Sequence, residues 1–279
     1  MRLKDKTAIV TGGASGFGAG IVRKFALEGA RVLVADINAD GAKAEAARHE
    51  GALHCAVDVS DGASVQAMVE TAIENMGHVD ILVNNAGILR DRMSWKMAEA
   101  EWDAVLAVHL KGHFTATRAA IAYWREQAKG GEQIAGRIIN TTSEAGLYGN
   151  AGQANYGAAK AGILGLQNVL VEETRQMNLT INAVSPRAAS RMAGAGLTED
   201  MASASQVSPL VVYLASDSAA DINGQVFLNY GGTLKLLKSW EEAAEVNQPG
   251  GFTAEDIEAA VGKLFENNES VKPPFIPKL

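Results

Sequence analysis

One glycine-rich stretch decides the fold of this chain: Thr11-Gly12-Gly13-Ala14-Ser15-Gly16-Phe17-Gly18. A short β-branched run, 7–11, leads into it, and an alanine-rich segment with helical spacing, 19–28, follows it. Glycine allows the backbone of such a turn to take unusual dihedral angles and to approach a phosphate closely. The start of the helix adds free N–H groups and the positive end of its dipole. The stretch therefore predicts a strand, a turn and a helix that together bind phosphate.

The second predicted strand, 31–35, gives this turn a context that an isolated glycine cluster lacks. It leads into Asp36, which stands eighteen residues after Gly18. At an offset of ~20 residues, an acidic side chain binds the ribose hydroxyls of a dinucleotide. A carboxylate there repels the 2′-phosphate of NADP, and the neighbouring Ser15 and Ile37 carry no cation that would hold it. We therefore predict NAD as the cofactor.

Strands and helices alternate up to about residue 232. We predict strands at 7–11, 31–35, 52–57, 80–84, 136–142, 179–184 and 225–228, and helices that include 19–28, 64–75, 101–127 and 156–176. Such alternation indicates an α/β fold with a Rossmann-like, doubly wound parallel sheet of about seven strands and helices on both faces. Ligands of these sheets bind at the carboxyl ends of the strands.

Residues 233–279 follow a different pattern. We predict helices at 235–246 and 253–266, the second with Thr253 and Asp256 as a capping pair, and an extended end at 272–277. This segment is too short for a hydrophobic core of its own. We therefore divide the chain into an NAD-binding domain with its substrate cleft, 1–232, and a C-terminal extension, 233–279. The extension either covers the cleft or enlarges a subunit interface.

The composition excludes several classes of protein. The 279 residues include 25 Lys and Arg against 32 Asp and Glu, a net charge of −7, which argues against binding to nucleic acid or to anionic membranes. No apolar run approaches the ~20 residues of a membrane span, and the run near the N-terminus is too short for a secretory signal. The lone Cys55 cannot form an internal disulfide. We expect a cytoplasmic protein.

The glycine turn is the first of three motifs that resemble, in this order, those of the short-chain dehydrogenase/reductase family. The other two are Asp58-Val59 and Asn84-Asn85-Ala86-Gly87. The resemblance implies a homodimer or homotetramer formed through helices 101–127 and 156–176, although their alanine and leucine content serves packing against the sheet equally well. It implies that the cofactor is bound by Gly12, Ser15, Gly16, Phe17, Gly18, Asp36, Ile37, Asp58, Val59, Asn85, Ala86, Gly87, Tyr156 and Lys160.

Tyr156 and Lys160 stand one helical turn apart in Tyr-Gly-Ala-Ala-Lys, so they share a helix face. A tyrosine with a pKa near ~10 is a poor base at pH 7, and a nearby lysine ammonium lowers that pKa. Ser143 follows the predicted strand 136–142 and reaches the same sheet edge. We predict that Ser143 binds the substrate oxygen and Tyr156 transfers the proton, while a nicotinamide carries the hydride. The alternative is an incidental Tyr–Lys pair.

His109 is a departure from the family pattern. It stands in Val108-His109-Leu110-Lys111-Gly112, where the family has an asparagine that completes the catalytic set with Ser, Tyr and Lys. A structural role and a proton relay stay equally open, and the ordinary pKa of imidazole, ~6.5, would make a relay pH-sensitive. His109 and His113 also have the spacing of zinc ligands on a helix, but no third ligand is evident, so we predict no metal site.

A narrower resemblance concerns the substrate. The segment 148–156, His109 and Ser190-Arg191-Met192 are similar to the (3R)-hydroxyacyl-CoA dehydrogenase unit of multifunctional β-oxidation enzymes and to its bacterial relatives. This resemblance implies NAD-linked oxidation of a secondary alcohol, with a 3-hydroxyacyl-CoA as the first choice of substrate. A hydrophobic alicyclic or steroid alcohol is the alternative, followed by a non-catalytic NAD(H)-binding sensor.

The segment after the sixth predicted strand also differs from the family. Pro186-Arg187 replaces the usual Pro-Gly, and the stretch from Pro186 to Pro209 is shorter than the typical substrate lid. A short lid leaves an open cleft, which suits a long substrate tail. Arg187 and Arg191 either meet the phosphates of CoA or are solvated loop arginines.

Overall fold

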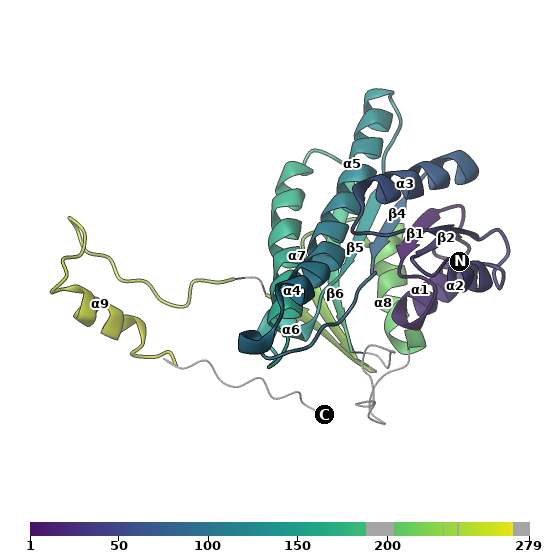
Figure 1. Ribbon diagram of the computed structural model, residues 1–279. Coiled ribbons are helices and arrows are strands. Elements are labelled where there is room, and N and C mark those ends of the chain that lie inside the picture. Colours follow the sequence, from purple (N-terminus) through teal and green to yellow (C-terminus); the bar gives the residue numbers. More distant parts are fainter. Residues whose placement is uncertain (188–203, 231, 239, 270–279) are drawn as a thin grey trace. The chain divides into compact units, whose positions relative to one another are not determined.

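The computed structural model describes residues 1–187, 204–230, 232–238 and 240–269, and the chain divides into two compact units at Leu237. The first unit is a sheet with helices on both faces (Figure 1). Its strands are β1 (Thr7–Thr11), β2 (Arg31–Asp36), β3 (Leu53–Ala56), β4 (Ile81–Asn84), β5 (Gly136–Thr141), β6 (Leu179–Pro186), β7 (Val226–Tyr230) and β8 (Thr233–Leu237). Among the residues that the structure describes, no helix is long and apolar enough to cross a bilayer.

The strand order is β3-β2-β1-β4-β5-β6-β7-β8, and every pairing is parallel except that of β7 with β8. The order reverses between β1 and β4, the place where open sheets of this kind bind their ligands. The predicted doubly wound α/β fold is thus confirmed, with one strand more than expected.

Two helical layers cover the sheet. On one face α1 (Gly16–Leu27) packs against α8 (Ala204–Ala215), with α2 (Ala39–Ala46) beside β2 and β3. On the other face lie α3 (Gly62–Met76), α5 (Gly112–Lys129) and α7 (Ala154–Glu173). The first layer is held by buried side chains such as Phe25 and Val211, and the second by Met68 and Trp124. The middles of these strands, such as residues 81–83, are buried on both faces and are therefore apolar, as their sequences predict.

The predicted helix 101–127 is interrupted. It consists of α4 (Glu99–Leu106), a π-helical turn at Ala107–Lys111 and then α5. A π-turn inserts about one extra residue into the α-helical path, and such turns are frequent at functional sites. Apolar periodicity does not reveal it, because both flanking segments keep their own helical spacing. His109 lies at the middle of this turn.

The prediction for the C-terminal segment was partly wrong. Helix 235–246 does not form: Thr233–Leu237 is strand β8, antiparallel to β7, and the described residues from 240 to 248 contain neither helix nor strand. Pairing satisfies backbone groups that β7 would otherwise expose at the sheet edge. The second predicted helix is present but shorter, as α9 (Ile257–Leu264). Ahead of it, Thr253 and Asp256 exchange the hydrogen bonds expected of a capping pair.

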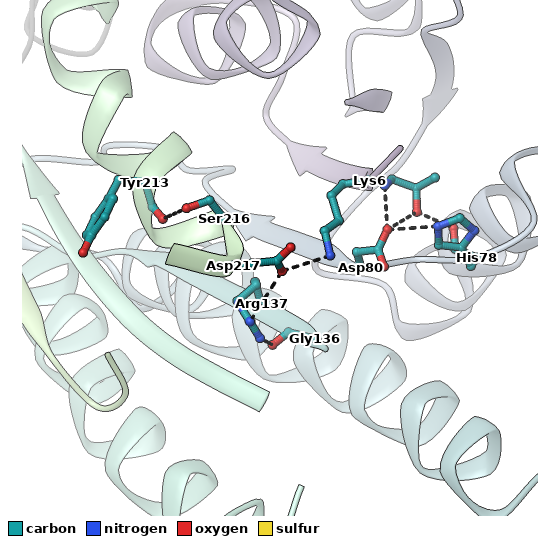
Figure 2. Close-up of polar contacts among 9 residues, drawn as sticks. Lys6, His78, Asp80, Gly136, Arg137, Tyr213, Ser216 and Asp217 are labelled. Carbon is teal, nitrogen blue, oxygen red and sulfur yellow. Dashed lines mark hydrogen bonds and ion pairs between the residues drawn. The ribbon is translucent and has the colours of Figure 1, made fainter. Parts of the chain in front are cut away.

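Ion pairs close the amino ends of the central strands (Figure 2). Asp217 lies 3.0 Å from Lys6 Nζ and 3.9 Å from the guanidinium of Arg137, which is buried in β5. Asp80 accepts the backbone N–H of Thr7 at 2.7 Å. Charges at this edge of the sheet are therefore matched by opposite charges.

Candidate active site

A cleft of about 640 Å³ opens at the carboxyl ends of the strands. The site residues expected from the sequence line this one cleft, with a single exception: Arg191 lies outside the described residues. The cleft is lined by Gly12, Ser15, Gly16, Phe17, Gly18, Asp36, Ile37, Asp58, Val59, Asn85, Ala86, Gly87, His109, Ser143, Tyr156, Lys160 and Arg187.

The glycine turn forms the floor of one end of the cleft. Gly12 and Gly16 have φ angles of +65° and +57°, a region that other residues rarely adopt. A Cβ on Gly18 would lie 2.1 Å from the carbonyl oxygen of Gly12, so only glycine is accommodated. Helix α1 begins at Gly16, and its first-turn N–H groups have no partner within the helix. This end of the cleft therefore suits the pyrophosphate of a dinucleotide.

The turn is tied to the loop after β4. Thr11 Oγ1 accepts hydrogen bonds from the N–H groups of Asn85 and Ala86 at 2.9 and 3.2 Å. The Asn85 amide donates in return to the carbonyl oxygens of Thr11 and Gly12 at 3.0 and 3.2 Å. These bonds fix two neighbouring loops at the switch point of the sheet.

Asp36 is held at the rim of the same end. Its carboxylate accepts the backbone N–H groups of Ala14 at 3.1 Å and Asn38 at 2.9 Å. The side chain therefore stands at a fixed place beside the glycine turn, and it lines the cleft together with Ile37 and Asn38.

Ser143, Tyr156 and Lys160 meet at the other end of the cleft. Ser143 is the N-cap of the short helix α6 (Glu144–Tyr148), and its Oγ accepts the N–H of Ala145 at 3.2 Å. Tyr156 and Lys160 lie on the first turns of α7, with Lys160 Nζ 5.7 Å from the centre of the tyrosine ring. Lys160 donates to the carbonyl oxygen of Thr141, the last residue of β5. The structure thus brings together the three residues that the sequence singled out.

Burial dominates the ionisation of this group. It raises the pKa of Tyr156 above its ordinary value, and the hydrogen bond with Ser143 acts in the opposite direction. Burial lowers the pKa of Lys160 from 10.5 to about 7. The expected lowering of the tyrosine pKa by a lysine ammonium is therefore not the main effect, because burial disfavours the charged form of both groups. Burial thus favours the uncharged amine of Lys160, which can accept a proton.

His109 is buried beside these residues and stays neutral. Its Nε2 lies 3.1 Å from the backbone nitrogen of Ile88 and 2.8 Å from its carbonyl oxygen, so one tautomer serves one of these groups at a time. Burial, followed by the charge of Lys160, lowers the pKa of His109 to about 3. The ring therefore does not titrate near the ordinary imidazole pKa that the prediction of a pH-sensitive relay assumed. The ring meets Tyr156 edge-on, with 5.1 Å between ring centres.

Glycine at position 87 makes room for this histidine. A Cβ there would lie 2.3 Å from Cε1 of His109. His113, one helical turn further along, is also buried, and burial lowers its pKa well below the ordinary value. Across the described residues, no group of three or more His, Cys, Asp or Glu side chains is arranged to hold a metal ion.

Some residues that line the cleft, and one contact of a predicted residue, were not predicted from the sequence. Arg187, expected to meet a CoA phosphate or solvent, forms two hydrogen bonds with the carboxylate of Glu144. Glu144, Thr142 and Gln153 also line the cleft. A signal for Thr142 and Glu144 was their place at the end of the predicted strand 136–142, which Thr142 closes and Glu144 follows by two residues, whereas nothing in the sequence pairs Glu144 with a residue 43 positions away.

Known proteins resemble this chain in sequence and in architecture. The sequence profile of the short chain dehydrogenase family matches residues 6–202. The chain belongs to the short chain dehydrogenase family. This dehydrogenase is 43% identical to the hydroxyacyl-CoA dehydrogenase ChsB1 of Mycobacterium tuberculosis, over 84% of this chain and 80% of that protein. The predicted family resemblance is confirmed.

Two further relatives extend the comparison. The peroxisomal multifunctional enzyme type 2 of Mus musculus is 37% identical, in a match that covers 99% of this chain but 39% of that enzyme's length. The crystal structure of a short chain dehydrogenase from Mycobacterium avium has a TM-score of 0.90 and 38% identity, and the match covers 99% of both chains. This dehydrogenase is therefore an oxidoreductase that acts on CH–OH groups, in a family that generally uses nicotinamide cofactors.

Proposed function

We propose that this dehydrogenase uses NAD to interconvert 3-hydroxyacyl-CoA and 3-oxoacyl-CoA thioesters. The observation that carries the proposal is the convergence of Ser143, Tyr156 and Lys160 on one end of a cleft whose other end is a glycine turn. The names of two relatives support the choice of substrate, since one is a hydroxyacyl-CoA dehydrogenase and another a peroxisomal multifunctional enzyme.

Each of the three residues has a distinct role in alcohol oxidation. A bound NAD supplies the hydride acceptor. Ser143 holds the substrate oxygen by a hydrogen bond, and Tyr156 removes its proton. Lys160, whose pKa is about 7 and whose Nζ lies 5.7 Å from the centre of the Tyr156 ring, becomes charged when it takes up a proton and then stabilises the phenolate that Tyr156 must form to act as a base. The neutral His109 fixes the backbone of Ile88 and packs against the edge of Tyr156, so its role is to orient the site.

Asp36 supports NAD over NADP. Two backbone N–H groups hold its carboxylate at the rim, where it accepts hydrogen bonds from a ribose and repels a 2′-phosphate. Asp36→Ala should raise the ratio of kcat/KM for NADP to that for NAD by about 10–100-fold, and Ile37→Arg in the same background should raise it further. Comparable use of both cofactors by the wild-type enzyme would overturn the assignment.

We also propose how the whole chain is used. Residues 1–232, continued by β8, form the NAD-binding domain and substrate cleft, and the following segment is an extension. The match to the mouse enzyme covers 99% of this chain, which supports a shared role for the extension. We further propose a homodimer or homotetramer located in the cytoplasm, to be tested by light scattering and by cell fractionation.

A substrate panel tests the reaction. Purified enzyme is assayed for NADH formation with 3-hydroxyacyl-CoA thioesters of short, medium and long chain, with a steroid alcohol, and with an alicyclic alcohol. The expected result is turnover of acyl-CoA thioesters with NAD. Turnover of free alcohols alone would move the function to the alternative substrate class. NADH binding without turnover of any substrate would instead indicate a non-catalytic NAD(H)-binding sensor.

Because one relative is a 3-oxoacyl-[acyl-carrier-protein] reductase from Thermotoga maritima, 35% identical over 83% of this chain, the panel includes an acyl carrier protein thioester. A preference for that carrier over CoA would keep the reaction and change the substrate.

A further inference from the structure

The residue that follows the proposed catalytic serine in the chain forms an ion pair. Glu144, the residue after Ser143, accepts hydrogen bonds from Arg187 at 2.9 Å (Nε to Oε2) and 2.7 Å (NH2 to Oε1). Both side chains are largely buried, with 16% and 20% of their surface exposed. A two-point pair of this kind fixes distance and orientation, and it is stronger than an exposed ion pair.

Arg187 is itself anchored by the last strands of the sheet. It follows β6, and its N–H donates to the carbonyl oxygen of Asn229 in β7 at 2.9 Å. Its guanidinium carbon lies 4.8 Å from the ring centre of Tyr230, and Lys235 Nζ from β8 lies 5.5 Å from the same centre. Cations over an aromatic ring are held by its quadrupole. Strand β7 thus holds Arg187 through both its backbone and its side chain.

Helix α6 needs such an anchor. It has five residues, too few for a helix to be stable without tertiary contacts. Ser143 caps it through the bond from the Ala145 N–H to Oγ, so its hydroxyl moves with the first turn of α6. The same hydroxyl bonds Tyr156 and lowers the pKa of the tyrosine. Movement of Glu144 therefore shifts the Ser143 hydroxyl relative to Tyr156.

We propose that Arg187 is a positioning residue: through Glu144 it holds the first turn of α6, so that the Ser143 hydroxyl stays within hydrogen-bond reach of Tyr156 and of the substrate oxygen. The proposal rests on the catalytic role proposed above for Ser143. A glycine at position 187, the usual family residue, has no side chain with which to form this pair. The arginine is therefore a feature of this chain's own site, and it is bound to Glu144 in place of a CoA phosphate.

The test compares Arg187→Met with a matched control, Arg23→Met. Arg23 also forms a two-point pair, with Glu45 at 2.8 and 3.2 Å, although it is more exposed than Arg187 and Glu45 also pairs with Arg48, and neither residue lines the cleft. Arg187→Met should lower kcat by about 10–100-fold and leave KM and the Kd for NADH within about twofold, because ground-state binding does not use the pair. The inflection that Lys160 sets near pH 7 should stay, whereas the one that Tyr156 sets above its ordinary pKa should move to still higher pH, since the Ser143 bond that lowers the tyrosine pKa is weakened. Arg23→Met should change none of these quantities.

A double variant separates this proposal from the proposed function. In the background of Ser143→Ala, Arg187→Met should reduce kcat no further, because the group that it positions is gone. An equal further loss would overturn the positioning role, as would full kcat or an unmoved pH profile in the single variant. Full activity of Ser143→Ala would instead refute the proposed role of the serine itself. If Arg187→Met does not fold, Glu144→Gln, which removes the charge and one acceptor of the pair, is subject to the same expectations.

Discussion

Ionisable side chains are treated in opposite ways at the two ends of the central strands. At the amino ends, Lys6 and Arg137 face Asp217, so each buried or half-buried charge has a counter-charge (Figure 2). At the carboxyl ends, Lys160 and His109 are 1% and 0% exposed. Burial lowers the pKa of both, and no acidic group among the described residues offsets this effect. Burial there favours neutral groups, whereas pairing favours charged ones. A neutral lysine can accept a proton and a paired one cannot, so the carboxyl ends are suited to the proton transfer proposed above.

Removal of the tyrosine hydroxyl gives the sharpest test of the carboxyl end. Tyr156→Phe should lower kcat by about 10²–10⁴-fold, the usual contribution of a general base. The affinity for NADH, measured by quenching of protein fluorescence, should stay within about twofold. Retained turnover would show that the proton leaves by another route, and the contrast between the two ends would then lose its functional meaning.

Lys160→Met tests whether the buried amine destabilises the fold. Because burial lowers its pKa from 10.5 to about 7, the unfolded state binds more protons between these pH values, and stability falls as pH decreases from 10.5 to 7. The variant should be inactive, and its free energy of unfolding at pH 7 should exceed that of wild type by roughly 2–4 kcal/mol.

Urea denaturation at two pH values provides the control for this variant. The gain in stability should be large at pH 7 and small above pH 10.5, where the wild-type lysine is mostly uncharged in the unfolded state as well. An equal gain at both pH values would point to better packing of methionine. A loss of stability at pH 7 would contradict the burial argument outright.

His109→Asn tests whether His109 only orients the site or also transfers a proton. An amide has both a donor and an acceptor for the N–H and C=O of Ile88, so kcat should stay within about tenfold of wild type. Since burial lowers the pKa of His109 to about 3, the inflection of the pH profile near 7 should persist in this variant. Its disappearance would identify the histidine, and not Lys160, as the titrating group.

Arg137→Met tests the amino end and should have the smallest effect. The substitution leaves Asp217 paired with Lys6 and 70% exposed, so no buried charge is left without a partner. The free energy of unfolding should change by about 1 kcal/mol or less, and kcat by less than about twofold. Calorimetry and a standard assay measure both. A loss of several kcal/mol would show that pairing at this edge stabilises the fold strongly.

Some features could be predicted from the sequence because the constraint lies in the backbone. Gly18 tolerates no Cβ, and Gly12 needs a positive φ, so the residue types themselves reveal the turn. The place of Ser143 at the cleft is predictable because polar residues after parallel strands gather at one edge of the sheet. Asp36 was found by its distance from the same turn.

Other features could not be predicted, because they depend on contacts between distant segments. Strand β8 contains Leu-Lys-Leu-Leu, which suits a helix equally well, and the free edge of β7 decides the outcome. The pKa values of Tyr156 and Lys160 depend on how deeply the fold buries them. The pair of Glu144 with Arg187 joins residues 43 positions apart, and no local pattern marks it.

The π-turn at Ala107–Lys111 sets the rotation of α5 relative to α4 about their common axis. One residue fewer at this place would restore an uninterrupted α-helix and rotate everything after it by about 100° relative to α4. His109 would then leave Ile88, and the faces of α4 and α5 would no longer meet α7 and α3 together. The number of residues between Trp102 and Trp124 therefore sets which faces of the two helices meet the rest of the fold, and a one-residue deletion between them should disrupt the site.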